Sequence, residues 1–201
     1  HVMATLKHFA LNSMENARFG VDVKVDERAL HEVYLPHFKR IVDEGVACVM
    51  TAYNSVNGEW CSQNEVLLAD ILRREWGFAG FVISDWIFGV HDGVKSLIAG
   101  LDVEMPYRMI RNAPIVAALS EGLDTEENIA SAVTRTLTTM LKFNVGKLPV
   151  SDRSVVLCSE HVLLSQEVAE KSSVLLKNES VDGVSLLPIN LKDNSKIAVF
   201  G

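Results

Sequence analysis

Short apolar runs alternate with longer mixed segments through the first 143 residues of the chain. The apolar runs predict strands at residues 2–9, 46–53, 81–84 and 101–105. The segments between and after them predict helices at residues 27–44, 65–76, 90–99, 113–121 and 126–143, and helical spacing of apolar positions is clearest in the first. Because the strands are continuously apolar and do not alternate, we expect a parallel sheet covered by helices on both faces.

Capping and breaking residues mark the ends of the first two helices. Asp26 is placed to cap the first helix and Gly45 to end it, and Asn64 and Gly77 do the same for the second. Pro36 lies inside the first helix, and we expect it to kink or split that helix.

Repeated βα units build either an open doubly wound sheet or a (β/α)8 barrel. A complete barrel takes about 250 residues, and the four strand–helix units here occupy only the first 143 residues. The predicted fold class is therefore α/β, with residues 1–143 as the C-terminal half of a (β/α)8 TIM-type barrel.

The composition changes after this region. Residues 144–159 contain Gly146, Pro149 and a polar stretch, and we expect a linker there. Residues 160–201 predict a helix at 160–173 and strands at 174–177 and 196–200, which is typical of the beginning of a second α/β domain. The 201-residue chain starts at His1 without an initiator Met and ends directly after an apolar run, so we expect an internal piece of a longer protein.

Composition excludes several classes of function. Hydrophobic residues make up 48% and charged residues 22% of the chain, which is typical of a globular protein and not of a disordered one. The formal net charge of −7 argues against nucleic acid as a partner. No apolar run approaches the roughly 20 residues of a membrane helix, so we expect no membrane partner.

The spacing of Cys48, Cys61 and Cys158 matches no zinc or redox motif, and we expect no metal and no cofactor. Compartment and oligomeric state stay open.

Chemically capable side chains gather where the predicted strands end. In a parallel α/β barrel the active site lies at the carboxyl ends of the strands. The residues there are Lys7 and His8 on the first strand, Met50 and Tyr53 at the second, Asp85 and Trp86 after the third, and Asp102 and Glu104 on the fourth. Chemically capable side chains on four successive predicted strands predict one shared site. We assign no chemical role to Asp102 or Glu104.

Asp85 is the candidate nucleophile. A carboxylate after strand 81–84 is expected at the barrel mouth, and Trp86 beside it offers a flat apolar face on which a sugar ring stacks. The alternative is that Asp85 caps the next helix or anchors a loop.

Lys7 and His8 offer hydrogen-bond donors to sugar hydroxyls, with a solvent-reaching lysine beside a core histidine as the alternative. Neighbours on a regular strand point to opposite faces, so we expect a distorted or cis peptide near Lys7–His8 if both face the pocket. Tyr53 can present its hydroxyl to the nucleophile and Met50 an apolar wall, and core packing is the alternative for both.

These residues lie in segments that resemble the motifs of family 3 glycoside hydrolases, in that family's order along nearly the whole chain. The segments in the barrel region are KHFALNSMENAR (7–18), EVYLPHF (32–38), MTAYN (50–54), GFVISDW (80–86) and GLDVEMP (100–106). Residues 173–178, 187–188 and 196–201 resemble the opening of the family's second domain, an α/β sandwich. The resemblance implies half a catalytic barrel followed by the beginning of that sandwich domain.

The resemblance also implies a retaining β-glycosidase, most often a β-glucosidase, that hydrolyses terminal non-reducing β-D-sugar residues. It assigns the covalent glycosyl-enzyme to Asp85, and the pocket of the non-reducing sugar to Lys7, His8, Met50, Tyr53 and Trp86. In the β-glucosidase branch the acid/base glutamate comes from the second domain, beyond this chain, so we expect little or no activity from the 201 residues alone. A β-xylosidase or another exo-β-glycosidase of the family is the alternative within this class.

Three functions from other classes remain as alternatives. One is a Schiff-base aldolase that uses Lys7 at a strand end, which requires a desolvated lysine. A second is a nucleotide-binding α/β protein, for which the strand 196–200 followed by Gly201 is the only support. A third is a sugar-binding protein without catalytic activity.

Overall fold

The computed structural model describes residues 2–123, 125–147, 152–180, 182–189, 196–198 and 200. The chain divides into two compact units, His1–Leu148 and Pro149–Gly201. The first unit holds every strand named in the described residues and all the predicted site residues.

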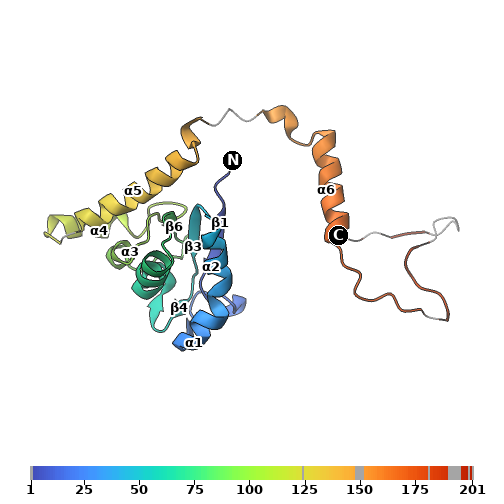
Figure 1. Cartoon of the computed structure of the whole chain (residues 1–201), viewed down its shortest axis with the longest axis horizontal. Coiled ribbons are helices and arrows are strands. Elements are labelled where there is room, and N and C mark those ends of the chain that lie inside the picture. The colour runs from blue at the N-terminus through green and yellow to red at the C-terminus, as the bar shows by residue number, and fades with distance from the viewer. Residues whose placement is uncertain are drawn as a thin grey trace. The chain divides into compact units, whose positions relative to one another are not determined.

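The centre of the first unit is a parallel sheet of three strands in the order β1-β3-β6 (Figure 1). These strands are β1 (Thr5–Phe9), β3 (Cys48–Thr51) and β6 (Phe81–Ile83). Each matches a predicted apolar run, and the parallel direction is confirmed by the pairings of β3 with β1 and with β6. Parallel strands end at the same edge of a sheet, so the residues that follow them are brought together.

The predicted strand at 101–105 is reduced to one parallel bridge between Val103 and Ile83. Side chains replace its ladder bonds on both sides of the bridge. The Val82 N–H donates to a carboxylate oxygen of Asp102 at 2.7 Å, and the Met105 N–H donates to the Ser84 hydroxyl at 2.9 Å. The segment therefore lies beside β6 but pairs with it by backbone only in part.

The predicted helix at 27–44 is split, as Pro36 led us to expect. It consists of α1 (Glu27–Ala29), a π-helical segment Leu30–Tyr34 and α2 (Pro36–Asp43). The Asp26 side chain accepts from the Ala29 N–H at 2.8 Å, which confirms the predicted cap. Gly45 ends the segment with a φ of 84°, a conformation that favours glycine.

The other predicted helices of this unit are present. They are the π-helical segment Val66–Glu75, α3 (Gly93–Ala99), α4 (Asn112–Ser120) and α5 (Glu126–Lys142). Helix α3 begins three residues later than expected, because Asp92 accepts from the Lys95 N–H at 2.9 Å and fixes its first turn.

A second, small sheet was not predicted. It pairs β2 (Asp22–Val23) with β4 (Ser55–Val56) and β4 with β5 (Glu59–Trp60). Strands of two residues carry no periodicity, so the sequence indicated only loops there.

The central sheet is covered differently on its two faces. Phe9, Val49 and Val82 join a large cluster with helix residues such as Leu68 and Leu72. On the opposite face the buried residues Cys48, Met50 and Ile83 pack with Phe81 of β6 and with Val103 and Met105 of the segment beside it, and no helix residue of the described part joins them. The chain has an α/β fold in which helices pack on one face of the sheet.

In its described part, the second unit contains a short 3-10 helix at Arg153–Val155 and the longer α-helix α6 (Ser159–Ser172). Helix α6 confirms the helix predicted at 160–173. No strand forms at 174–177 or at 196–198, and Val199 lies outside the described residues. A strand exists only by pairing with a neighbour, and these exposed segments have no partner strand in the described part.

Candidate active site

The carboxyl ends of β1, β3 and β6 bring four of the predicted site residues together. His8 lies near the end of β1, Tyr53 two residues after β3, and Asp85 and Trp86 directly beyond β6. The His8 Nε2 atom is 3.5 Å from Asp85 Oδ2. The Tyr53 hydroxyl donates to the Trp86 backbone carbonyl at 2.8 Å. These contacts join residues that lie up to 77 positions apart in the chain.

Asp85 is a buried carboxylate that is only half satisfied. It is 6% exposed, and its Oδ1 accepts from the Trp86 N–H at 2.7 Å. Its Oδ2 is buried and accepts no hydrogen bond within the described residues. Because Asp92 caps α3, the helix-capping alternative for Asp85 is wrong. An unpaired buried carboxylate oxygen is costly, which points to a role other than stability.

Gly89 holds the loop after Asp85 close to it. A Cβ atom at Gly89 would lie 2.5 Å from the Asp85 carbonyl oxygen and 2.8 Å from its backbone nitrogen. Only glycine therefore permits this approach, and the loop packs against the backbone of the carboxylate residue. The sequence contained Gly89 but gave no sign of this contact.

His8 faces Asp85 from a strand with irregular geometry. The Lys7–His8 peptide bond is cis, as the sequence led us to expect, and Phe9–Ala10 is cis as well. Burial lowers the pKa of His8, the charge of Asp85 opposes this shift, and the charges of Lys7 and Arg18 add to it. The imidazole is thus favoured in its neutral form, in which one ring nitrogen donates and the other accepts.

Lys7 lies at the same strand end but is not brought against Asp85. It is exposed, and no ion pair is formed by it within the described part of the chain. It lines a hollow of about 260 Å³ together with His8, Asn12 and Tyr34.

Tyr53 and Met50 differ in their surroundings. Burial raises the pKa of Tyr53, and the negative charge of Asp85 raises it further. The hydroxyl is therefore protonated and close enough to Asp85 to respond to its charge. Met50 is buried on the face of the central sheet that no described helix covers, where it packs with Cys48 and Ile83.

Arg18 and Phe19 are neighbours of the site that the sequence did not single out. The Arg18 guanidinium lies 4.7 Å from the Phe19 ring centroid and 5.6 Å from that of Tyr53, and it pairs with Glu15. Both residues lie in a loop without periodicity, so only the position of Arg18 within the 7–18 motif gave any signal.

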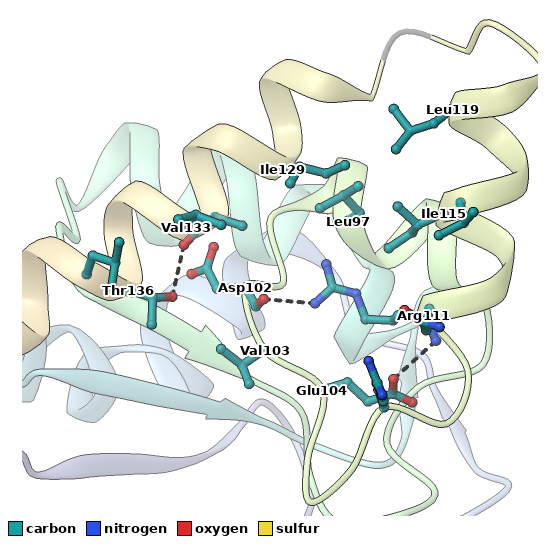
Figure 2. Close-up of a pocket in the computed structure, with 15 residues that line it drawn as sticks. Leu97, Asp102, Val103, Glu104, Arg111, Ile115, Leu119, Ile129, Val133 and Thr136 are labelled. Atoms are coloured by element: carbon teal, nitrogen blue, oxygen red, sulfur yellow. Dashed lines mark hydrogen bonds between the residues drawn. The ribbon is translucent and has the colours of Figure 1, made fainter.

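Asp102 and Glu104 are fully engaged in structural contacts. The Asp102 side chain is completely buried and accepts from Arg73 at 2.7 Å and from Arg135 at 2.7 and 2.9 Å, besides the Val82 N–H. Burial lowers the pKa of Arg73 to about 10, although Asp102 opposes this shift. Glu104 accepts the backbone N–H groups of residues 109, 110 and 111, and Figure 2 shows the bond from Arg111. Neither carboxylate is available for proton transfer.

A cavity of about 600 Å³ lies between α3, α4 and α5 (Figure 2). Apolar helix residues line most of it, and Asp102, Glu104 and Arg111 lie at one end. None of the six predicted site residues lines this cavity, so it is separate from the site at the strand ends.

The described residues give no support for a metal or a membrane span. They contain no group of three or more His, Cys, Asp or Glu side chains arranged to hold a metal ion. None of the helices in the described part is long and apolar enough to cross a bilayer.

Residues 1–139 match the model of the glycosyl hydrolase family 3 N-terminal domain. The chain belongs to this family. That assignment agrees with the motifs on which the sequence resemblance was based.

Known relatives are similar along the whole chain. It is 41% identical over 207 residues to a β-glucosidase of Rhizobium radiobacter and 41% identical over 202 residues to thermostable β-glucosidase B of Acetivibrio thermocellus, with 100% of this chain aligned in both. The chain spans only 24% and 25% of these two relatives.

Solved β-glucosidase structures are similar in fold. A Bifidobacterium adolescentis family 3 β-glucosidase gives a TM-score of 0.77 at 36% identity over 92% of this chain and 26% of that one. A Kluyveromyces marxianus β-glucosidase in complex with glucose gives 0.76 at 37% identity over 87% of this chain and 22% of that one.

Proposed function

We propose that this chain supplies the nucleophile and part of the sugar pocket of a retaining β-glucosidase. The observation that carries the proposal is the buried Asp85 carboxylate, whose Oδ2 accepts no hydrogen bond from any described residue and lies 3.5 Å from His8 Nε2. Family membership and the β-glucosidase relatives support the choice of reaction.

In this reaction Asp85 Oδ2 attacks the anomeric carbon of the non-reducing sugar. The bond from that carbon to Oδ2 forms as the bond to the glycosidic oxygen breaks, and a general acid protonates the departing oxygen. Water activated by the same group then displaces Asp85 and releases the sugar with retained configuration.

The general acid must be a second carboxyl group about 5–5.5 Å from the nucleophile. Asp102 and Glu104, the other carboxylates at the strand ends, are occupied by guanidinium and backbone donors. We therefore assign the acid/base to a glutamate outside these 201 residues, as the family resemblance implies, and expect the isolated chain to hydrolyse little or nothing.

The remaining site residues hold the sugar. Lys7 and His8 donate hydrogen bonds to its hydroxyls, and Trp86 offers a ring face for stacking. Tyr53 fixes the segment after the nucleophile through its hydrogen bond to the Trp86 carbonyl. Met50 borders the pocket from the face of the central sheet that no described helix covers.

We infer further that residues 1–143 are the C-terminal half of a (β/α)8 barrel, residues 144–159 a linker, and residues 160–201 the beginning of an α/β sandwich domain. The parallel order β1-β3-β6, the segment at Val103 beside it and the sheet face that no described helix covers support this arrangement. A closed barrel buries such a face in its interior.

Alternatives from other classes have less support. A Schiff-base aldolase needs a desolvated lysine, and Lys7 is exposed. The nucleotide-binding alternative depends on Gly201, which lies outside the described residues. A β-xylosidase is the main alternative within the class, because none of the described site residues is assigned to the part of the sugar in which glucose and xylose differ.

The test uses the full gene product that contains this chain. We expect hydrolysis of a 4-nitrophenyl β-glucoside, with β-glucose as the first anomer seen by NMR, and slower hydrolysis of the matching β-xyloside. The first anomer being α-glucose would overturn the retaining mechanism, and a faster rate on the xyloside would overturn the choice of sugar.

A further inference from the structure

The loop between Asp85 and α3 is anchored at its far end by the small sheet. The His91 ring stacks on the Trp60 ring, with centroids 3.8 Å apart and an interplanar angle of 12°. The next backbone N–H along the chain, that of Asp92, donates to the Gln63 side chain at 2.9 Å. We call these two contacts, Trp60 with His91 and Gln63 with Asp92, the hairpin clamp.

The side of the clamp that belongs to the small sheet is itself fixed. Trp60 ends β5, which pairs antiparallel with β4. Gln63 ends the 3-10 helix Cys61–Gln63, is buried, and donates to the Glu59 carboxylate at 2.7 Å. The same carboxylate oxygen accepts from the Trp60 N–H at 3.1 Å. The clamp therefore holds the loop against a rigid support.

The clamped end of the loop reaches the proposed nucleophile within a few residues. Val90 is buried in the main core cluster. Gly89 comes next toward Asp85 and lies so close to it that a Cβ atom would be 2.5 Å from the Asp85 carbonyl oxygen. Residues 86–88 between them are each at least 40% exposed. The part of the loop that is fixed by packing is thus the part that contacts the backbone of Asp85.

We propose that Trp60 and His91 are positioning residues for the nucleophile. Through the loop, their stacked rings hold the backbone of Asp85, and with it the Oδ2 atom, in the place from which it attacks the anomeric carbon. This inference rests on the proposed function, because it concerns the step in which Asp85 acts.

The size of the effects separates this role from a purely structural one. One stacked ring pair adds only modestly to the free energy of unfolding. A displacement of a reacting group by about 1 Å, in contrast, costs about 100-fold in rate. Loss of the stack between Trp60 and His91 is therefore expected to lower activity much more than stability.

The experiment measures kcat and KM for a 4-nitrophenyl β-glucoside with the full gene product, well below the midpoint of thermal unfolding of each variant. In Trp60→Ala we expect kcat to fall about tenfold and KM to change less than about twofold, because Asp85 is displaced while the sugar contacts stay in place. Trp60→Phe keeps a ring for stacking and is expected to recover at least about half of the original kcat.

A double variant tests the stack itself. His91→Ala alone is expected to lower kcat as Trp60→Ala does, since each removes one ring of the same pair. The double variant is expected to lose less than about twofold more than either single variant.

Lys95→Met is the matched control. It breaks the ion pair of Lys95 with Glu59, at 3.7 Å, which joins the same hairpin to α3 and leaves both contacts of the clamp in place. We expect kcat to stay within about twofold of the unmodified protein.

An unchanged kcat in Trp60→Ala, a change confined to KM, or no recovery in Trp60→Phe would overturn the positioning role. Additive losses in the double variant, or an equal loss in Lys95→Met, would overturn it as well. Failure of the unmodified protein to hydrolyse the glucoside is a different outcome. It would overturn the proposed function, and the inference about the clamp with it.

Discussion

Asp85 directly follows β6 and Asp102 lies beside β6; both carboxylates are buried, and their surroundings are opposite. Asp102 accepts hydrogen bonds from two arginines and from the Val82 N–H, so both of its oxygens are satisfied. Asp85 accepts one bond on Oδ1 and none on Oδ2 within the described residues. Burial alone therefore does not distinguish the two carboxylates; the lack of a described donor to one oxygen of Asp85 does.

The two environments also differ in what they do for the fold. Asp102 links Arg73 from the helix before β6, Arg135 from α5 and the backbone of β6, and it takes the place of a missing ladder bond. Among the described residues, Asp85 bonds to the N–H of its own neighbour and interacts with His8 and Tyr53, all within the site. A group that adds cost without joining elements is typical of a functional site.

Replacing Asp85 is expected to give the largest change in activity. Asp85→Asn keeps the acceptor for the Trp86 N–H and removes the nucleophile, so kcat of the full gene product is expected to fall about 10⁴-fold or more. Its stability is expected to stay equal or to rise, because the unpaired charge is lost. Steady-state kinetics and urea unfolding measure the two effects. A variant with more than about a tenth of the original kcat would contradict the assignment.

Replacing Asp102 is expected to give the largest change in stability. Asp102→Asn leaves the buried guanidinium groups of Arg73 and Arg135 without their counter-charge, and we expect a loss of about 3–5 kcal/mol in the free energy of unfolding. Asp43→Asn is the control, because Asp43 pairs with Lys39 on the surface of α2 and its loss is expected to cost under about 1 kcal/mol. Similar losses of unfolding free energy in the two variants would show that the buried ion pairs of Asp102 stabilise the fold no more than a surface ion pair does.

Tyr53→Phe is expected to have a smaller effect. It removes the hydrogen bond to the Trp86 carbonyl, worth about 1 kcal/mol of stability, and loosens the segment that carries Asp85. Thermal unfolding measures the loss. Tyr34→Phe is the matched control, since the hydroxyl of Tyr34 makes no hydrogen bond in the part of the chain that the structure describes. No difference between the two variants would show that the bond does not hold this segment.

The smallest expected effect is a dependence of stability on pH. Burial lowers the pKa of His8 below its ordinary 6.5, so the unfolded chain binds a proton more readily than the folded one. The contribution of neutral His8 to the free energy of unfolding is thus complete above about pH 6.5. It is lost as the pH falls toward the lowered pKa. His8→Gln is expected to flatten this slope. His91 shares the direction of shift, and His91→Gln reports its separate contribution. An unchanged slope in His8→Gln would show that His8 is not held neutral.

Much of the fold and site could be predicted from the sequence. The apolar runs located β1, β3 and β6, Pro36 marked the split of the first helix, and the strand-end rule brought His8, Tyr53, Asp85 and Trp86 together. These features are encoded locally, either by periodicity or by a single residue whose backbone is restricted.

Other features depend on contacts between distant segments. Nothing near Phe19 in the sequence indicates that it contacts Tyr53 and Phe88, and nothing near Asp102 indicates two arginines 29 and 33 positions away. The strand predicted at 174–177 did not form because an apolar run needs a partner strand as well as its own propensity.

Trapping of the covalent intermediate tests the role of Asp85 most directly. The full gene product is incubated with a 2-deoxy-2-fluoro-β-glucoside bearing a good leaving group, which slows release of the glycosyl-enzyme, and the labelled peptide is mapped by mass spectrometry. We expect one sugar per chain, attached to Asp85, with no label on Asp102 and none in Asp85→Asn. A label on any other residue, or steady turnover without a label, would contradict Asp85 as the nucleophile.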